Sequence, residues 1–179
     1  MEFTHLHVHT EYSLLDGSNK IKEYVARIKE LGMDSAAITD HGVMYGVIDF
    51  YRAARAEGIN PILGCEVYVA PGSRFDREAG SGEDRYYHLV LLAENNQGYA
   101  NLMKIVSKGF VEGYYYRPRV DKEVLREYHE GIIALKYHSE RNFLFRKCPD
   151  NAGLLPLHPH TFLSGDIWQP HRQGRHLVQ

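Results

Sequence analysis

The stretch Thr4-His5-Leu6-His7-Val8-His9-Thr10 places three histidines at alternate positions near the start of the chain. Successive side chains of a β-strand point to opposite faces, so we expect a strand over residues 4–10 with the three histidines on one face. Leu6 and Val8 would then occupy the other face. Three imidazoles flanked by threonines make a poor core face, but neutral imidazole is a common metal ligand. A His-x-His pair also occurs in ordinary strands, so the metal hypothesis depends on what the later strands bring to the same place.

Segments with helical and strand periodicity alternate from Thr4 to about Leu135, and turn residues such as Gly32 and Gly58 separate them. We expect helices over about residues 21–31, 47–55, 96–106 and 121–128, and strands over residues 4–10, 35–39, 62–69, 86–93 and 131–135. This alternation is typical of βα units, and it predicts an α/β fold with a parallel sheet. In such folds functional groups gather at the carboxyl ends of the strands.

Metal-ligand side chains occur in or near several of these predicted strands. The candidate ligands are His7, His9, Asp16, His41, Glu66 and His88. Imidazole nitrogen and carboxylate oxygen without thiolate suit zinc, manganese or iron. A carboxylate such as Glu66 can bridge two ions, and paired ions about 3.5–4 Å apart suit the hydrolysis of phosphate esters. The catalytic group would be a metal-bound water, with no separate side chain assigned.

Each candidate also has an ordinary structural interpretation. An unpaired Glu66 would be costly to bury in an apolar strand, which favours a ligand role. His88 fits an ordinary strand histidine, and Asp16 before a glycine fits a plain turn residue. Asp40 either caps the next turn or orients a ligand histidine without binding the ion itself. His5 is expected to support the ligands or the fold and not to bind an ion.

The composition favours a single domain without a general attraction for nucleic acid. The chain has 179 residues, 44% of them hydrophobic, and a formal net charge of −2. It can bury a core, and it lacks a global basic field. Cys65 and Cys148 are the only cysteines, which favours a reducing compartment over a disulfide framework. We find no secretory leader and no apolar run of about 18 residues, so we expect a cytoplasmic protein without membrane contact.

Five short motifs resemble those of the polymerase and histidinol phosphatase (PHP) domain. They are His7-Val8-His9-Thr10, Ser13-Leu14-Leu15-Asp16-Gly17, Thr39-Asp40-His41-Gly42, Gly64-Cys65-Glu66 and Tyr87-His88-Leu89. Two longer stretches resemble, more narrowly, the PHP domain at the amino terminus of bacterial DNA polymerase III alpha subunits. They are Asn96-Gln97-Gly98-Tyr99-Ala100-Asn101-Leu102-Met103-Lys104 and Gly113-Tyr114-Tyr115-Tyr116-Arg117-Pro118-Arg119-Val120-Asp121. The resemblance covers about residues 1–135.

This resemblance implies an incomplete (β/α)7-type barrel with a trinuclear metal site at one mouth. It implies that one ion is held by His7, His9 and Glu66, a second by Glu66 and His88, and a third by Asp16 and His41. We therefore expect two or three divalent ions, which would be zinc, manganese or iron.

Two ligands that complete the family's site are missing from this sequence. One is a Cys or His just after the strand that ends here at Leu135, where the nearest candidate is His138. The other is a later Asp-x-His, which occurs nowhere in the chain. Residues 136–179 also lose periodicity and hold four of the seven prolines.

We therefore divide the chain into a partial PHP barrel, residues 1–135, and an irregular tail, residues 136–179. The tail is either a linker or a frameshifted or mispredicted continuation of a longer polymerase gene. In the second case, His158 and His160 are accidental and not ligands.

The resemblance leaves three functions open. The first is a metal-dependent phosphoesterase, as a 3′–5′ exonuclease serving an attached polymerase, with Arg117 and Arg119 as candidate phosphate contacts. The second is a non-catalytic structural module of the polymerase, and the third is a stand-alone small-molecule phosphatase. DNA and other replisome subunits would be partners through the full-length polymerase, whose catalytic palm we expect outside this sequence.

Overall fold

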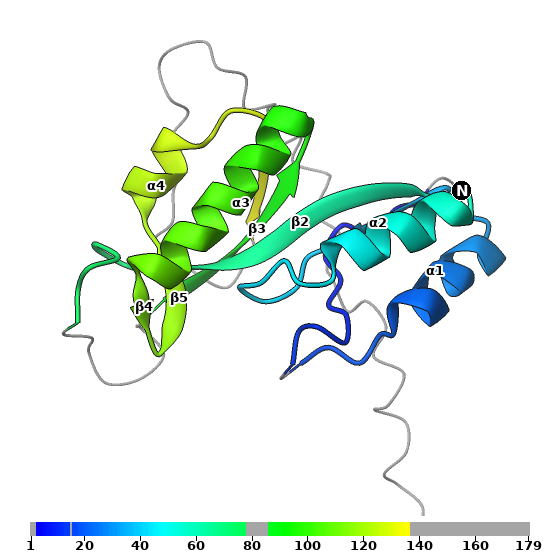
Figure 1. The fold of residues 1–179 in the computed structure, drawn as a ribbon, viewed down its shortest axis with the longest axis horizontal. Helices are drawn as coiled ribbons and strands as arrows, with labels where there is room; N and C mark the ends of the chain where they lie inside the picture. Colours follow the sequence, from blue (N-terminus) through cyan, green and yellow to red (C-terminus); the bar gives the residue numbers. More distant parts are fainter. Residues whose placement is uncertain (1–2, 15, 78–85, 137–179) are drawn as a thin grey trace, which may run out of the picture. The chain divides into compact units, whose positions relative to one another are not determined.

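The computed structural model of the chain describes residues 3–14, 16–77 and 86–136, which all belong to one unit of the chain, Met1–Leu144. Four helices and six strands, interleaved along the chain, are found in this part (Figure 1). The expected α/β class is therefore confirmed. No helix among these residues combines the length and the hydropathy that a membrane crossing requires.

The described strands form one mixed sheet around the long strand β2 (Asn60–Val69). β2 pairs in parallel with β1 (Ser35–Ile38) and antiparallel with β3 (Tyr87–Ala93), and β3 pairs antiparallel with β6 (Ile132–Lys136). The prediction of a parallel sheet is therefore wrong for β3. A parallel pair needs a crossover long enough for a helix, and within the described residues no helix lies between β2 and β3.

Helices α1 (Ile21–Glu30) and α2 (Val47–Ala56) pack on each other and on the part of the sheet where β1 meets β2 (Figure 1). Both helices bury one apolar stripe, as the helical spacing predicted. This core cluster contains Ile21, Val25, Ile28, Ala36, Ile38, Val47, Phe50, Ala54 and Ile59.

Helix α3 (Asn96–Val111) covers one face of β2 and β3, together with the short helix α4 (Lys122–Glu127). Because side chains alternate along a strand, Cys65, Val67 and Val69 of β2 point into this core. The residues between them, Glu66 among them, must point to the opposite face. The metal-ligand candidates therefore lie on the face of the sheet that α3 does not cover.

Strand β5 (Arg117–Val120) pairs in parallel with the end of β2 and antiparallel with the two-residue strand β4 (Tyr114–Tyr115). The sequence pattern did not predict this hairpin. Its apex is Tyr116, which has a φ of 60°. A bulky residue in the left-handed region is unusual, so the apex is a strained position that its surroundings must hold in place.

Residues 4–10 do not form the strand that the alternating histidines predicted. The segment runs beside β1, where the carbonyl of His5 accepts from Ala37 at 3.1 Å and that of Val8 accepts from Thr39 at 2.9 Å. The two accepting residues, His5 and Val8, are three positions apart, whereas the two donors, Ala37 and Thr39, are two positions apart. The N–H of Val8 donates to Oγ1 of Thr39 at 2.8 Å in place of a backbone partner. The extra residue breaks the period of two on which the prediction of one shared histidine face depended.

Candidate metal centre

The register of the sheet brings ligand side chains from three strand positions to one place. Tyr68 of β2 pairs with His88 of β3, so Glu66, two residues before Tyr68, lies on the same face as His88. A parallel bridge between His41 and Glu66 extends the line of β1 along β2. Because β3 is antiparallel, its amino end lies at the carboxyl end of β2. His88 reaches the site from the start of its strand for this reason.

All six candidate ligands lie in three overlapping groups whose ligand atoms are within 4.8 Å of one another. The groups are His7, His9 and Glu66; His9, Asp16 and His41; and His41, Glu66 and His88. Any two of these groups share one residue, so the six side chains form a single continuous cluster. The side chain of Glu66 is 5% exposed, whereas that of His88, at the rim, is 41% exposed.

The first group has the chemistry and the spacing of a metal site. Oε2 of Glu66 lies 2.9 Å from Nε2 of His7 and 2.6 Å from Nε2 of His9. The two Nε2 atoms lie 3.1 Å apart. The ligand atoms of a tetrahedral ion with bonds of about 2.0–2.1 Å are separated by roughly 3.3 Å, so the three atoms are close to the spacing that one ion imposes. Two imidazole nitrogens and a carboxylate oxygen also suit a divalent ion.

The other two groups extend this arrangement. Oδ2 of Asp16 lies 2.9 Å from Nδ1 of His9 and 3.1 Å from Nδ1 of His41. The Nε2 atoms of His41 and His88 are 3.5 Å apart, and Nδ1 of His88 is 3.7 Å from Oε1 of Glu66. The two oxygens of Glu66 thus face different histidines, which is the placement that a bridging carboxylate requires.

The electrostatics of the cluster favour a charged Glu66. Burial raises the pKa of Glu66, but hydrogen bonds from His7 and His9 outweigh it and hold the pKa well below its usual range. Burial lowers the pKa of His9, but its hydrogen bond and charge interaction with Glu66 raise it on balance. Burial dominates at His41 and lowers its pKa, which favours the neutral imidazole that a metal needs.

Buried hydrogen bonds behind the ligands hold the His9–Asp16 loop in place. Asp40 accepts from the backbone N–H of Thr10 at 2.6 Å and from its hydroxyl at 2.8 Å. The hydroxyl of Ser13 donates to Asp16 at 2.5 Å and accepts from the N–H of His41 at 3.1 Å. Asp40 therefore positions the backbone next to His9 through Thr10. Thr10 and Ser13 belong to two of the family motifs quoted above, but their hydrogen-bonding roles were not predicted.

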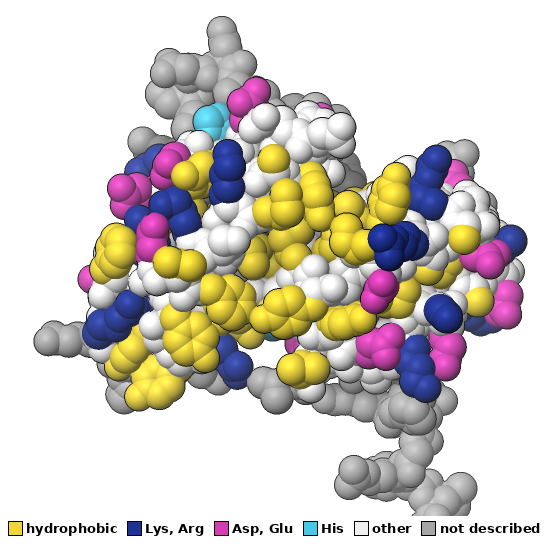
Figure 2. Space-filling model, viewed as in Figure 1, with side chains coloured by type: hydrophobic (Ala, Val, Ile, Leu, Met, Phe, Trp, Pro, Cys, Tyr) yellow, Lys and Arg dark blue, Asp and Glu magenta, His cyan; other side chains and the backbone are white. Residues whose placement is uncertain are grey.

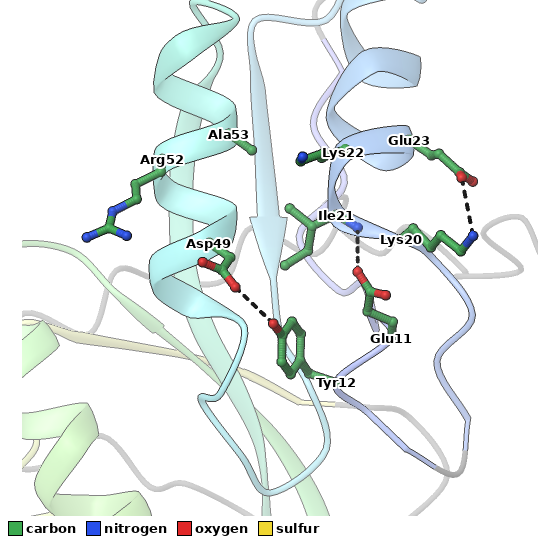
Figure 3. A pocket seen from close by; sticks show the side chains of 9 residues that line it. All are labelled: Glu11, Tyr12, Lys20, Ile21, Lys22, Glu23, Asp49, Arg52 and Ala53. Atoms are coloured by element: carbon green, nitrogen blue, oxygen red, sulfur yellow. Dashed lines mark hydrogen bonds and ion pairs between the residues drawn. The ribbon is translucent and has the colours of Figure 1, made fainter.

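A second set of contacts ties the same loop to α1 and α2, beside a cavity of about 630 Å³ (Figure 3). The hydroxyl of Tyr12 donates to Asp49 of α2 at 2.8 Å, and Glu11 accepts from the N–H of Ile21 at 3.3 Å. None of the six candidate ligands lines this cavity. The residues that line this cavity therefore help to hold the ligand loop in place.

His5 lies outside the three ligand groups. Its ring packs edge-on against Phe3 with 4.8 Å between ring centroids, and burial lowers its pKa. Its Nδ1 is buried and has no hydrogen-bond partner among the described residues. His5 therefore does not belong to the cluster of candidate ligands, and its supporting role stays a prediction.

The candidate phosphate contacts Arg117 and Arg119 occupy different environments. Arg119 is buried, and its guanidinium donates to the carbonyl oxygens of Gly113, Arg74 and Asp76. Arg117 is partly exposed and lies over the ring of Tyr68, 5.7 Å from its centroid. The geometry favours Arg117 as the phosphate contact.

The predicted completing ligand His138 and the histidines His158 and His160 lie outside the described residues. The same holds for the tail beyond Lys136, the last residue of β6.

Tyr68 is a neighbour of the cluster that was not predicted from the sequence. Its position two residues after Glu66 in a strand was the available signal, because such residues share a face.

Comparison with known proteins shows the family of this chain. The model of the PHP domain family matches residues 5–166, so the chain belongs to the PHP domain family. This confirms the expected class of a PHP-type barrel. The chain is 53% identical over 135 residues to DNA polymerase III subunit alpha of Treponema pallidum and 49% identical over 135 residues to that of Chlamydia pneumoniae.

Each of these matches covers 75% of this chain, but the chain spans only 12% and 11% of the lengths of the two relatives. A solved amidohydrolase from Chromobacterium violaceum, with bound sulfate and no metal, gives a TM-score of 0.40 at 26% identity. That match covers 59% of this chain and 34% of the amidohydrolase. The family assignment therefore rests on the sequence matches.

Proposed function

We propose that the cluster binds two or three divalent metal ions and hydrolyses phosphodiesters as a 3′–5′ exonuclease within a longer DNA polymerase III alpha subunit. The observation that carries the proposal is the position of Glu66, whose two carboxylate oxygens face His7, His9 and His88 from one buried place. Zinc, manganese and iron are the ions that this set of nitrogen and oxygen ligands suits. Because the relatives are DNA polymerase III alpha subunits, we infer a context of DNA replication in the cytoplasm, with DNA and other replisome subunits as partners.

The residues of the chain divide the work in this proposal. Ions bound here would lower the pKa of a water and neutralise charge on the phosphate. His7, His9 and Glu66 would hold one ion, Glu66 and His88 a second, and Asp16 and His41 a third. Asp40 and Ser13 keep the ligand loop in register, and Arg117 at the rim offers a cation for a substrate phosphate.

The test is a comparison of the chain with its Glu66→Gln variant. Metal content after dialysis should fall by at least one ion per chain in the variant, because an amide is a weaker ligand than a carboxylate. Release of nucleotides from a 5′-labelled single strand in Mn²⁺ should fall at least about a hundredfold. Glu57→Gln, on the exposed end of α2, is the matched control. Equal nuclease rates in the two variants would refute the exonuclease proposal.

The alternative function is a non-catalytic module in which metal serves the fold. One observation favours it: the six ligands come from four separate segments of the chain, so an ion would tie these segments together. His41→Ala in a full-length alpha subunit separates the two functions. Loss of nuclease with intact polymerase activity supports the exonuclease, whereas loss of both activities together with stability supports the structural role.

A further inference from the structure

An aromatic and cationic surface adjoins the metal cluster on its His88 side. Tyr86 stacks on His88 with 5.6 Å between ring centroids and an interplanar angle of 30°, and it meets Tyr68 edge-on at 4.9 Å. Tyr68 in turn lies 4.9 Å from the ring of His41. Arg117 lies over the ring of Tyr68, 5.7 Å from its centroid, and an interaction with Tyr86 raises the pKa of Arg117. The ligands and this surface are therefore in direct contact.

Tyr68, Tyr86 and Arg117 form one connected group beside the cluster, because Tyr68 contacts the rings of His41 and Tyr86 and lies under Arg117. We call the set Tyr68, Tyr86 and Arg117 the tyrosine–arginine surface. In Figure 2, hydrophobic side chains with neighbouring Lys and Arg gather over β4 and β5 at the lower left.

The backbone holds this surface at a defined position. The hairpin pairs Tyr115 with Arg117 across the strained apex at Tyr116, and β5 is fixed to β2 by the pairing of Arg119 with Tyr68. Gly42 lets the chain after β1 pass close to Tyr68, because a Cβ there would lie 2.8 Å from the tyrosine ring. A strained residue that persists in a fixed hairpin is typical of a functional position.

The chemistry of the surface selects its ligand. Aromatic faces bind unpaired bases by stacking, and a guanidinium binds phosphate through several of its five N–H donors. A duplex hides its base faces and would demand a broad basic field, which a chain with a net charge of −2 lacks. Alternating aromatic and cationic groups beside a hydrolytic site therefore suit a single strand.

We propose that the tyrosine–arginine surface binds the terminal nucleotides of a single-stranded nucleic acid and directs the end of the strand to the metal cluster. The delivery of the strand's end to the metal cluster rests on the proposed exonuclease function, whereas the binding of the strand by the surface does not. A terminal base stacks on Tyr86, and Arg117 contacts a neighbouring phosphate.

The test measures binding in EDTA, where hydrolysis is absent, with the 179-residue chain and a fluorescein-labelled oligothymidylate of twelve nucleotides. Fluorescence anisotropy should show that Tyr86→Leu and Arg117→Gln each raise the Kd by about tenfold. An abasic strand of the same length should bind the unaltered chain about tenfold more weakly, since it offers no bases to stack. Tyr51→Leu and Arg55→Gln, both exposed on α2, are matched controls that should leave the Kd unchanged.

Equal Kd values for the two surface variants and the two controls would overturn the proposal, and so would equal binding of the abasic strand. Unchanged circular dichroism of the variants shows that a lost affinity does not come from unfolding. Strand binding that depends on Tyr86 and Arg117, without any metal-dependent cleavage, would support the surface while refuting the exonuclease.

Discussion

Glu66 is a buried carboxylate that the apolar neighbours in its strand do not neutralise. Its compensation comes from imidazoles that the fold brings from residues 7, 9 and 41. A lone buried carboxylate would be protonated or would destabilise the chain, so Glu66 and its histidines must be understood as one unit. In the absence of metal, hydrogen bonds from His7 and His9 favour the ionised form of Glu66.

This balance predicts a window of pH for the metal-free chain. A carboxylate whose pKa falls below its usual value of 4.5 stabilises the fold above that pH and loses its contribution as the pH falls further. A histidine whose pKa rises above its usual value of 6.5 stabilises the fold below that pH and loses its contribution as the pH rises. The interaction of His9 with Glu66 should therefore contribute most between pH 4.5 and 6.5.

Urea unfolding in EDTA checks this prediction. The measured quantity is the free energy of unfolding of the chain minus that of its His9→Gln variant. This difference should be largest inside the window. At pH 3.5 and at pH 8 it should be lower than this maximum by up to about 1 kcal/mol. His129→Gln, an exposed histidine, is the control and should show no such maximum. A difference that grows steadily with pH would contradict the expected sign for His9.

Asp40 leads to a second prediction for a single residue. Asp40 is 1% exposed, and Asp40→Ala would leave two buried donors of Thr10 without their acceptor. We expect a loss of about 1–3 kcal/mol in the free energy of unfolding and metal binding about tenfold weaker. Asp34→Ala, at an exposed aspartate, should change stability by no more than about 0.5 kcal/mol. Denaturant unfolding and metal titration of both variants measure the two effects, and equal losses would refute a positioning role for Asp40.

The elements are held together at points where backbone approaches backbone. Asn95 caps the start of helix α3, because its side chain accepts from the N–H of Gly98 at 2.9 Å. Gly98 lies directly against the turn before β6, and Asn101 donates to the carbonyl of Glu130 at 2.9 Å. The first turn of α3 is thus the contact through which β6 is fixed beside β3.

Gly98→Ala tests this contact against helix propensity. Alanine is the better helix former by about 0.8–1.0 kcal/mol, so propensity alone predicts stabilisation. A Cβ at position 98 would collide with the carbonyl of Gly131, and we expect instead a destabilisation of at least about 2 kcal/mol. Ser107→Ala, on the exposed face of the same helix, should be neutral or slightly stabilising. Thermal and urea unfolding of the two variants would show opposite signs, and a stabilised Gly98→Ala would contradict the close approach.

At the scale of the whole molecule, the candidate metal centre joins segments that are distant in the sequence. The ligands come from residues 7–16, 41, 66 and 88, so they link the loop before α1 with three strand positions. An ion that binds only the folded chain raises stability in proportion to the logarithm of its concentration. β6 also has no second partner strand within the described residues, which is a liability for an isolated sheet.

We therefore expect marginal stability for the isolated chain and a clear gain in stability when metal binds. Addition of Zn²⁺ or Mn²⁺ at about a hundred times its Kd should stabilise the chain by about 2.7 kcal/mol, which scanning calorimetry would record as a higher Tm. Glu66→Gln should abolish most of this gain, whereas Glu57→Gln should keep it. A cooperative transition above about 60 °C in the metal-loaded chain would contradict marginal stability.

The sequence by itself determined the local elements and the list of candidate ligands. Apolar spacing predicted α1 and α2 to within one residue of their observed ends, because each helix buries one stripe of side chains. Donor chemistry selected six side chains that the structure brings into one cluster, and their role as ligands stays a prediction. The alternation around Glu66 also indicated that a charged residue stood in an apolar strand.

The tertiary structure decided what local patterns do not contain. The direction of β3 depends on its connection to β2, and the alternation of residues 4–10 fails because three residues there face two on β1. Arg117 and Arg119 are equivalent in the sequence, but only the packing of the folded chain shows that Arg119 is buried and that Arg117 lies over Tyr68. Local periodicity records which side of an element is apolar, whereas pairing between distant strands decides which side chains meet.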